Sequence, residues 1–264
     1  MGEAIVVTSG KGGVGKTTSS ANIGTALAIL GKRVCLLDTD IGLRNLDVVM
    51  GLESRILYNL VDVVEGNCQL HQALVKDKRV ENLFLLPAAQ TKDKSAVQPD
   101  QVKRIVEELK RDFDYVMIDC PAGIEQGFQN AVAGADAAIV VTTPETAAVR
   151  DADRVIGLLL STYQLHPRLV INRIRPQLVK RGEMLDVEEV MSILAIDLLG
   201  VVPDDEHVIR AGNQGEPVVY STGTKASQAY RNIARRVLGE NVPLMPLEDQ
   251  PGVMGRLARL FGRR

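Results

Sequence analysis

Short runs of apolar residues alternate along the chain with longer segments of helical character. The short runs lie at 4–9, 33–38, 82–88, 115–119, 137–143, 168–173 and 198–203. Nearly continuous apolar runs of this length are typical of strands covered on both faces. The longer segments predict helices at about 17–30, 55–65, 99–111, 125–133, 145–161, 186–194, 204–212 and 223–238. This alternation predicts an α/β fold: a mostly parallel, buried sheet with right-handed crossovers and helices on both faces.

The composition favours one large domain. Of the 264 residues, 45% are apolar and only 3% are aromatic, so the core is expected to consist of Val, Ile, Leu and Ala. Cys35, Cys68 and Cys120 are far apart and form no CxxC pair. We therefore expect a reducing cytosol, without a disulfide framework or a zinc site. No apolar run approaches the ~20 residues that a membrane span requires.

The C-terminal part of the chain differs from the rest. Residues 241–251 contain three prolines and are interpreted as a linker after a domain that spans 1–240. A single apolar stripe beside an arginine-rich side then predicts an amphipathic tail helix at 252–264. The residues expected to meet a membrane are Val253, Met254, Arg256, Leu257, Arg259, Leu260 and Phe261.

The basic charge of this tail is local. The chain has a formal net charge of −2, which becomes −6 without the four arginines of the tail. A basic tail on an acidic body favours attachment of the tail alone to an anionic membrane surface. A helix this short is marginal in water, so we expect it to become ordered on lipid. The alternative is a terminal helix packed against its own domain.

The stretch "SGKGGVGKTT" lies between the first predicted strand and the first predicted helix. Gly10, Gly15, Lys16 and Thr17 match the pattern G-x-x-x-x-G-K-T of a P-loop NTPase. Such a loop surrounds a polyphosphate with backbone N–H groups, its lysine reaches the β- and γ-phosphates, and its threonine hydroxyl binds Mg²⁺. The predicted phosphate-binding residues are Gly12, Gly13, Val14, Gly15, Lys16, Thr17 and Thr18. Lys11 is an extra lysine, and from the residues alone it is as readily a solvated side chain.

Polar residues follow other predicted strands. Asp119 ends one strand and is expected to support the magnesium. Asp38 is a second candidate for this role, whereas Asp40, on the more exposed side of its turn, is the candidate to orient or deprotonate the attacking water. The alternative for Asp38 and Asp40 is that they only cap and solvate their loop. The alternative for Asp119 is that it only caps a loop. The amide of Asn172 can pair with a donor and an acceptor on adenine, or it simply ends a strand.

Taken together, these motifs resemble the MinD family of deviant Walker A ATPases, which help to place the bacterial division site. "KGGVGKTT", with its early lysine, is similar to the phosphate loop of that family. "DTDIGLRNLDVVMG" and "DCPAGIEQGF" are similar to its two switch segments, and "INR", "VVPDDE" and "NQGEPVV" also have counterparts. The resemblance covers the whole chain, including the tail. Cys120 is a departure, because Ser or Thr is expected there.

The resemblance implies an ATP-dependent homodimer that hydrolyses ATP with Mg²⁺. Lys11 would cross to the partner's phosphates, as an arginine finger does in trans. Asp40 would be the catalytic-water residue, with Asp38 and Asp119 as magnesium supports. The adenine site implied by the resemblance consists of Asn172, Arg173, Pro203 and Asp204.

The family also implies partners and a location. A cytoplasmic protein would become peripheral on the inner face of the cell membrane when ATP joins two tails in one dimer. A division inhibitor like MinC and a topological regulator like MinE would be partners, and regulators would meet the segment 144–154 at the dimer edge.

Other functions share the phosphate loop. A ParA-type DNA-segregating ATPase needs a basic surface, which the acidic body argues against, so DNA binding is not expected. A nitrogenase-reductase-like electron carrier would need a second suitable cysteine besides Cys120. A flagellar-number ATPase with a membrane tail and a purely structural nucleotide-binding module remain as alternatives.

Overall fold

The computed structural model describes residues 1–247, so the tail predicted at 252–264 lies outside the described residues. Within them, one sheet has the strand order β3-β4-β2-β5-β1-β6-β7-β8. All neighbouring strands are parallel except β3, which runs antiparallel to β4. The strands are β1 (Glu3–Thr8), β2 (Val34–Asp38), β3 (Val75–Lys76), β4 (Leu83–Leu86), β5 (Tyr115–Asp119), β6 (Ala137–Thr142), β7 (Pro167–Ile174) and β8 (Leu198–Pro203).

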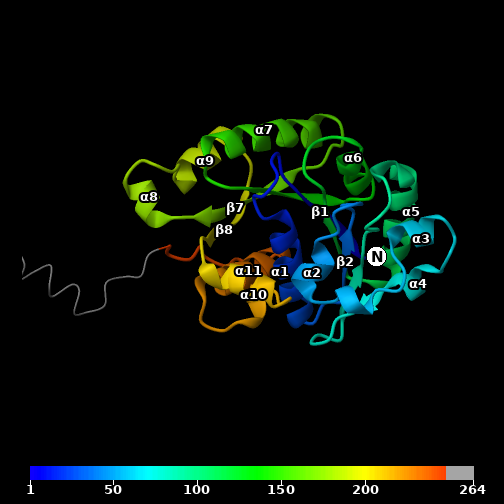
Figure 1. Cartoon of the computed structure of the whole chain (residues 1–264). Helices are drawn as coiled ribbons and strands as arrows, with labels where there is room; N and C mark the ends of the chain where they lie inside the picture. The colour runs from blue at the N-terminus through cyan, green and yellow to red at the C-terminus, as the bar shows by residue number, and fades with distance from the viewer. Residues whose placement is uncertain (248–264) are drawn as a thin grey trace, which may run out of the picture.

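Helices cover both faces of this sheet (Figure 1). Successive strand residues face opposite ways, so that Ala4 and Val6 pack into one core and Ile5 and Val7 into the other. The Ile5 core contains α1 (Lys16–Ile29), α2 (Leu46–Met50), α10 (Glu206–Asn213), the 3₁₀ turn η3 (Val218–Tyr220) and α11 (Lys225–Val237). The Ala4 core contains α3 (Leu60–Val64), α4 (Leu70–Ala73), α5 (Pro99–Asp112), α6 (Gln126–Val132), α7 (Thr146–Ser161) and α9 (Val187–Leu194). The remaining short elements are η1 (Glu53–Arg55), η2 (Lys94–Ala96) and α8 (Pro176–Lys180).

The predicted α/β architecture is confirmed, and a strand lies in each of the predicted strand positions. The predicted helix at 55–65 is wrong in its first half. The side chain of Asn59 accepts hydrogen bonds from the N–H groups of Val61 and Asp62, and a new helix therefore begins at Leu60. The sequence pattern missed β3, α2, α4 and α8, which are too short to show a period of their own.

Residues 241–247 lie against α11. The Arg236 side chain donates to the carbonyl oxygens of Val242 and Pro243, each at 2.9 Å, and Lys225 Nζ donates to that of Leu247 at 3.3 Å. The first part of the predicted linker is thus attached to the domain, and 248–251 lie outside the described residues. Across 1–247, none of the helices has the length and apolar character needed to cross a membrane.

The carboxyl ends of β1, β2 and β5 meet at one edge of the sheet. β5 lies between the other two strands, and its Asp119 is in register with Val7 of β1 and Asp38 of β2. Because these strands are parallel, the loops that follow them emerge together, where open α/β sheets bind ligands.

Candidate nucleotide-binding site

The loop between β1 and α1 depends on its glycines. Gly13 and Gly15 have φ angles of 80° and 101°, in the left-handed region that glycine adopts readily. Gly15 is also the N-cap of α1, and a Cβ there would lie 2.3 Å from Asn172 Nδ2. A Cβ on Gly10 would lie 2.1 Å from backbone atoms of Asp151. Asp151 and Asn172, which are far from the loop in sequence, therefore lie against its two ends and leave no room for a side chain at Gly10 or Gly15.

The two lysines of the loop have different environments. Lys16 is only 7% exposed, and its Nζ donates to Ser9 Oγ at 3.0 Å, while the Ser9 hydroxyl donates to the Lys11 carbonyl at 2.7 Å. The Lys16 ammonium is thus held beside the start of α1, where free N–H groups attract an anion. The Lys11 side chain is exposed. The other predicted phosphate-binding residues follow the loop: exposed Gly12 and Gly13, buried Val14, and half-buried Gly15, Thr17 and Thr18.

Asp38 and Asp119 form a pair of buried carboxylates at neighbouring strand ends. Each is 1% exposed, and they are register partners of β2 and β5. Asp119 accepts a hydrogen bond from Ser20 Oγ at 2.9 Å, and Asp38 accepts two from the backbone N–H groups of Asp40 and of Leu46, the first residue of α2, at 2.9 and 3.3 Å. Burial raises the pKa of Asp119 to about 6, although hydrogen bonds from Thr17 and Ser20 oppose the shift. Burial and the nearby charge of Asp119 raise the pKa of Asp38.

This pair fits a divalent cation. Two buried carboxylates side by side disfavour their joint ionisation, and a bound cation relieves that repulsion. Thr17 lies close enough to Asp119 to lower the pKa of that carboxyl group, so the loop and the carboxylates adjoin. Carboxylate and hydroxyl oxygens are ligands that magnesium accepts. No three His, Cys, Asp or Glu side chains within 1–247 are arranged to hold a metal alone, and magnesium typically completes its shell with water and substrate phosphates.

Asp40 belongs to the same cluster of carboxylates. It is half-buried, and its charge contributes to the raised pKa values of Asp38 and Asp119, so the three carboxylates are close together. Its backbone carbonyl accepts hydrogen bonds from Leu43 and Arg44, which hold it in a turn after β2. The structure therefore brings the half-buried Asp40 together with the predicted magnesium residues.

The predicted adenine residues line one cleft of about 190 Å³ at the ends of β7 and β8. Asn172 is 4% exposed; its Nδ2 donates to the Val14 carbonyl at 2.8 Å, and its Oδ1 accepts from the Arg173 N–H at 3.0 Å. Asn172 thus hydrogen-bonds to the backbone of the phosphate loop. The sequence did not predict this contact. The cleft is lined by Thr18, Asn172, Arg173, Arg175, Pro203, Asp204, Asp205, Val208 and Ile209.

Sequence reasoning missed two polar side chains of the site. Ser20, which contacts Asp119, lies one helical turn after Lys16, and that spacing could have pointed to it. Arg175 pairs with Asp204, with 2.6 Å between Nε and Oδ2, across the ends of β7 and β8. No local sequence pattern predicts this ion pair, because it depends on which strands are neighbours in the sheet.

Comparison with known proteins decides the family. A profile of the CobQ/CobB/MinD/ParA nucleotide binding domain matches residues 5–218. The septum site-determining protein MinD of Bacillus subtilis is 67% identical over the full length of both chains. The chain belongs to the MinD family. The resemblance read from the motifs is thereby confirmed.

Solved structures agree with this membership. The MinC:MinD cell division protein complex of Aquifex aeolicus matches with a TM-score of 0.86 and 50% identity, covering 92% of this chain and 99% of that one. MinD of Pyrococcus horikoshii, solved as a complex with Mg-ADP, matches with a TM-score of 0.82 and 30% identity, covering 90% and 96%. The P-loop NTPase fold predicted for the body of the protein is confirmed.

Proposed function

We propose that this protein is an ATPase that binds Mg²⁺ and ATP, dimerises, and positions the cell-division site by recruiting a division inhibitor. One observation carries the proposal: in a MinD-family chain, the buried Lys16 ammonium lies near the Asp38–Asp119 carboxylate pair, close enough for its charge to act on Asp119. A phosphate-binding amine beside a cation site is what a magnesium nucleotide requires. The Mg-ADP complex of the Pyrococcus protein supports the choice of ligand.

In this proposal, Lys16 and the backbone from Gly12 to Thr18 hold the phosphates. Thr17, Asp38 and Asp119 hold the magnesium, which would neutralise phosphate charge. Asn172, Arg173, Pro203 and Asp204 border the adenine. Asp40, half-buried beside the carboxylate pair, orients the attacking water or accepts its proton.

Lys11 supports a dimeric mechanism. Its side chain is exposed, while Lys16 already occupies the loop. A second amine on the same loop is best used on a neighbouring subunit, where it would stabilise the growing negative charge of the transition state in trans. The homodimer would present two tails, at 252–264, to an anionic membrane, so ATP switches attachment on and hydrolysis switches it off.

The partners follow from the family. The Aquifex MinC:MinD complex supports a division inhibitor as the recruited protein. A MinE-like regulator near the start of α7 and a cytoplasmic pool that becomes peripheral at the membrane complete the proposed cycle. A ParA-type or flagellar-number role is the alternative, and the net charge of −6 without the tail arginines disfavours a DNA-binding body.

Turnover and sedimentation of the natural protein and three variants test the proposal. The natural protein should be a dimer with a non-hydrolysable ATP analogue and a monomer with ADP. Asp40→Ala should bind ATP and dimerise, but lose turnover by about 10²–10⁴-fold. Lys11→Ala should bind ATP without turnover. Glu107 is an exposed acid on α5, and Glu107→Ala should behave as the natural protein.

A natural protein that binds ATP but stays monomeric, or an Asp40→Ala variant with full turnover, would contradict the proposed mechanism.

A further inference from the structure

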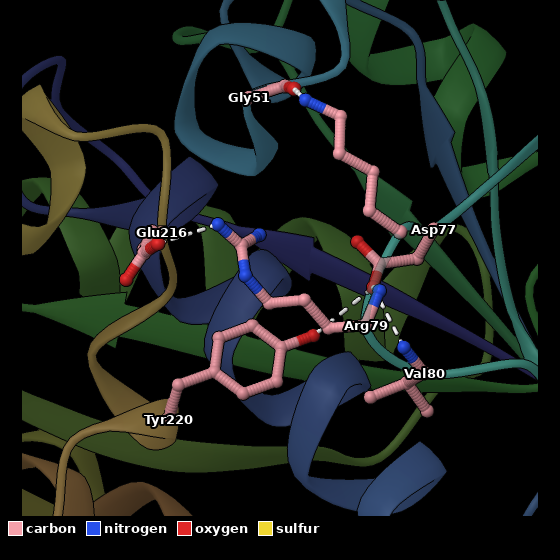
Figure 2. Close-up of polar contacts among 7 residues, drawn as sticks. Gly51, Asp77, Arg79, Val80, Glu216 and Tyr220 are labelled. Carbon is pink, nitrogen blue, oxygen red and sulfur yellow. Dashed lines mark hydrogen bonds and ion pairs between the residues drawn. The ribbon is translucent and has the colours of Figure 1, made fainter.

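The turn between β3 and β4 makes polar contacts in two directions (Figure 2). At its centre is Asp77, a carboxylate that is 5% exposed. Its Oδ1 accepts hydrogen bonds from the N–H groups of Arg79 and Val80, at 2.7 and 2.9 Å, and from the Tyr220 hydroxyl at 3.2 Å. The turn is therefore fixed internally and tied to η3, which lies far from it in sequence.

From this turn, two cations reach the ends of two different helices. Lys78 Nζ donates to the carbonyl oxygen of Gly51, the C-cap of α2, at 2.7 Å. Arg79 forms an ion pair with Glu216, just beyond α10, and lies over the ring of Tyr220 with 5.3 Å between its Cζ and the ring centroid. Figure 2 shows Gly51 and Glu216 on separate segments, with the Arg79 side chain directed toward Glu216.

The same two helix ends also touch directly, backbone to backbone. Gly51 and Gly215 both have left-handed φ angles, 62° and 66°. A Cβ on Gly51 would lie 2.6 Å from the Gly215 carbonyl oxygen, and a Cβ on Gly215 would lie 2.6 Å from Gly51 Cα. There is no space in this contact for one helix end to move toward the other without displacing it.

Each of these helices starts at a different end of the nucleotide site. The first N–H of α2, that of Leu46, donates to Asp38 Oδ2 at 3.3 Å, and Arg44 pairs with Asp47 at 2.8 Å across the helix start. At its own first turn, α10 contributes Val208 and Ile209 to the adenine cleft. A short helix thus leads from each end of the site to the Gly51–Gly215 contact.

We propose that Gly51, Asp77, Lys78, Arg79, Gly215, Glu216 and Tyr220 form a latch that couples the adenine cleft to the carboxylates at the phosphate end. These are positioning residues, and the inference rests on the proposed ATPase function. A base that fills the cleft fixes α10, the latch passes that restraint to α2, and α2 holds the Asp38–Asp40 loop in its productive geometry. The base then increases the rate of hydrolysis as well as the affinity, because a misplaced reacting group slows catalysis steeply.

Two substrates separate this role from a merely structural one. ATP fills the cleft, whereas ribose 5′-triphosphate carries the same phosphates without a base. In the natural protein, kcat for ATP should exceed kcat for ribose 5′-triphosphate. In Gly215→Ala the ratio of the two kcat values should fall about fivefold or more, a typical size for coupling between sites. The fall should come from ATP alone, with kcat for ribose 5′-triphosphate unchanged.

Gly66→Ala is the matched control, because Gly66 has a φ of 76° and a Cβ added there would meet nothing within 4 Å. That variant carries the same backbone strain and should keep the natural kcat ratio. The double variant Arg79→Gln, Glu216→Gln removes an ion pair that is partly solvent-exposed and tests the latch if Gly215→Ala does not fold. It should also lower the ratio.

Three results would overturn the latch: a kcat ratio near one in the natural protein, an unchanged ratio in the folded latch variants, or an equal loss with both substrates. A natural protein that hydrolyses neither substrate would instead refute the ATPase function on which the latch rests.

Discussion

Burial raises the pKa of the two residues that are predicted to hold magnesium, Asp38 and Asp119. Asp119 ends a buried strand beside Asp38, and desolvation raises its pKa to about 6 despite the hydroxyl groups that bond to it. A carboxyl group with a raised pKa favours folding most when protonated. Its contribution to stability is therefore present at low pH and is lost as the pH rises through its folded pKa. A cation bound at the predicted magnesium site would offset this unfavourable charge.

Replacing Asp119 with Asn should consequently separate stability from binding. At pH 8 the free variant should have a free energy of unfolding about 1–3 kcal/mol higher than that of the natural protein, since one pKa unit equals about 1.4 kcal/mol. The difference should vanish near pH 4, where the natural carboxyl group is protonated. Magnesium-dependent ATP binding should be lost at both pH values. Urea unfolding and calorimetric titration measure the two effects, and a destabilised Asn variant at pH 8 would show that the negative charge itself holds the strand ends together.

At the scale of elements, one side chain joins two helix starts beside the cleft. Asp205 is the N-cap of α10, where its Oδ1 accepts from the His207 N–H at 3.0 Å, and its Oδ2 accepts from the Ala226 N–H in α11 at 3.2 Å. Burial raises the pKa of this carboxyl group, but the hydrogen bonds from His207 and Ala226 outweigh it and leave the pKa lowered. The ionised carboxylate therefore stabilises the fold at neutral pH.

Asp205→Ala should lower the free energy of unfolding by about 1–2 kcal/mol at pH 7, the usual loss for an N-cap residue. Because the folded pKa is depressed, this stabilisation is present above the unfolded value of about 3.9 and is lost as the pH falls through the folded value. The difference between the two proteins should therefore shrink at pH 3. Urea unfolding at both pH values checks the sign, and Glu206→Ala, an exposed neighbour in the same first turn, serves as the control. An equal difference at pH 3 would mean that lost packing, rather than charge, causes the effect.

Local patterns predicted the elements that carry the chemistry but few of the contacts between them. Lys16 and Asp119 could be placed from sequence because a glycine loop and a continuous apolar strand each fix the position of the residue that follows. The Asn172–Val14 bond joins residues 158 positions apart, and the Tyr220–Asp77 bond joins residues 143 positions apart. Such pairs depend on the strand order and on helices as short as α2, neither of which a periodic pattern specifies.

At the scale of the whole molecule, the sequence separates an acidic body from a basic end. The net charge of −2 becomes −6 without the four tail arginines. The segment that leads to the tail is attached to α11 as far as Leu247, through Arg236 and Lys225. Each subunit of the proposed dimer would therefore carry its tail beyond a segment that is attached to α11.

Membrane binding should accordingly depend on nucleotide. One tail buries a few apolar side chains and must be ordered at the same time, so it should bind weakly. Two tails on one dimer should bind anionic vesicles about 10²-fold more tightly, because the second contact is intramolecular. Co-sedimentation with such vesicles should therefore be strong with ATP, weak with ADP, and absent for a chain that lacks 252–264. Leu257→Glu should remove binding while keeping the ATP-dependent dimer, and Glu240→Gln, an exposed acid before the linker, should change neither. Equal binding under all nucleotide conditions would separate the membrane from the ATP cycle.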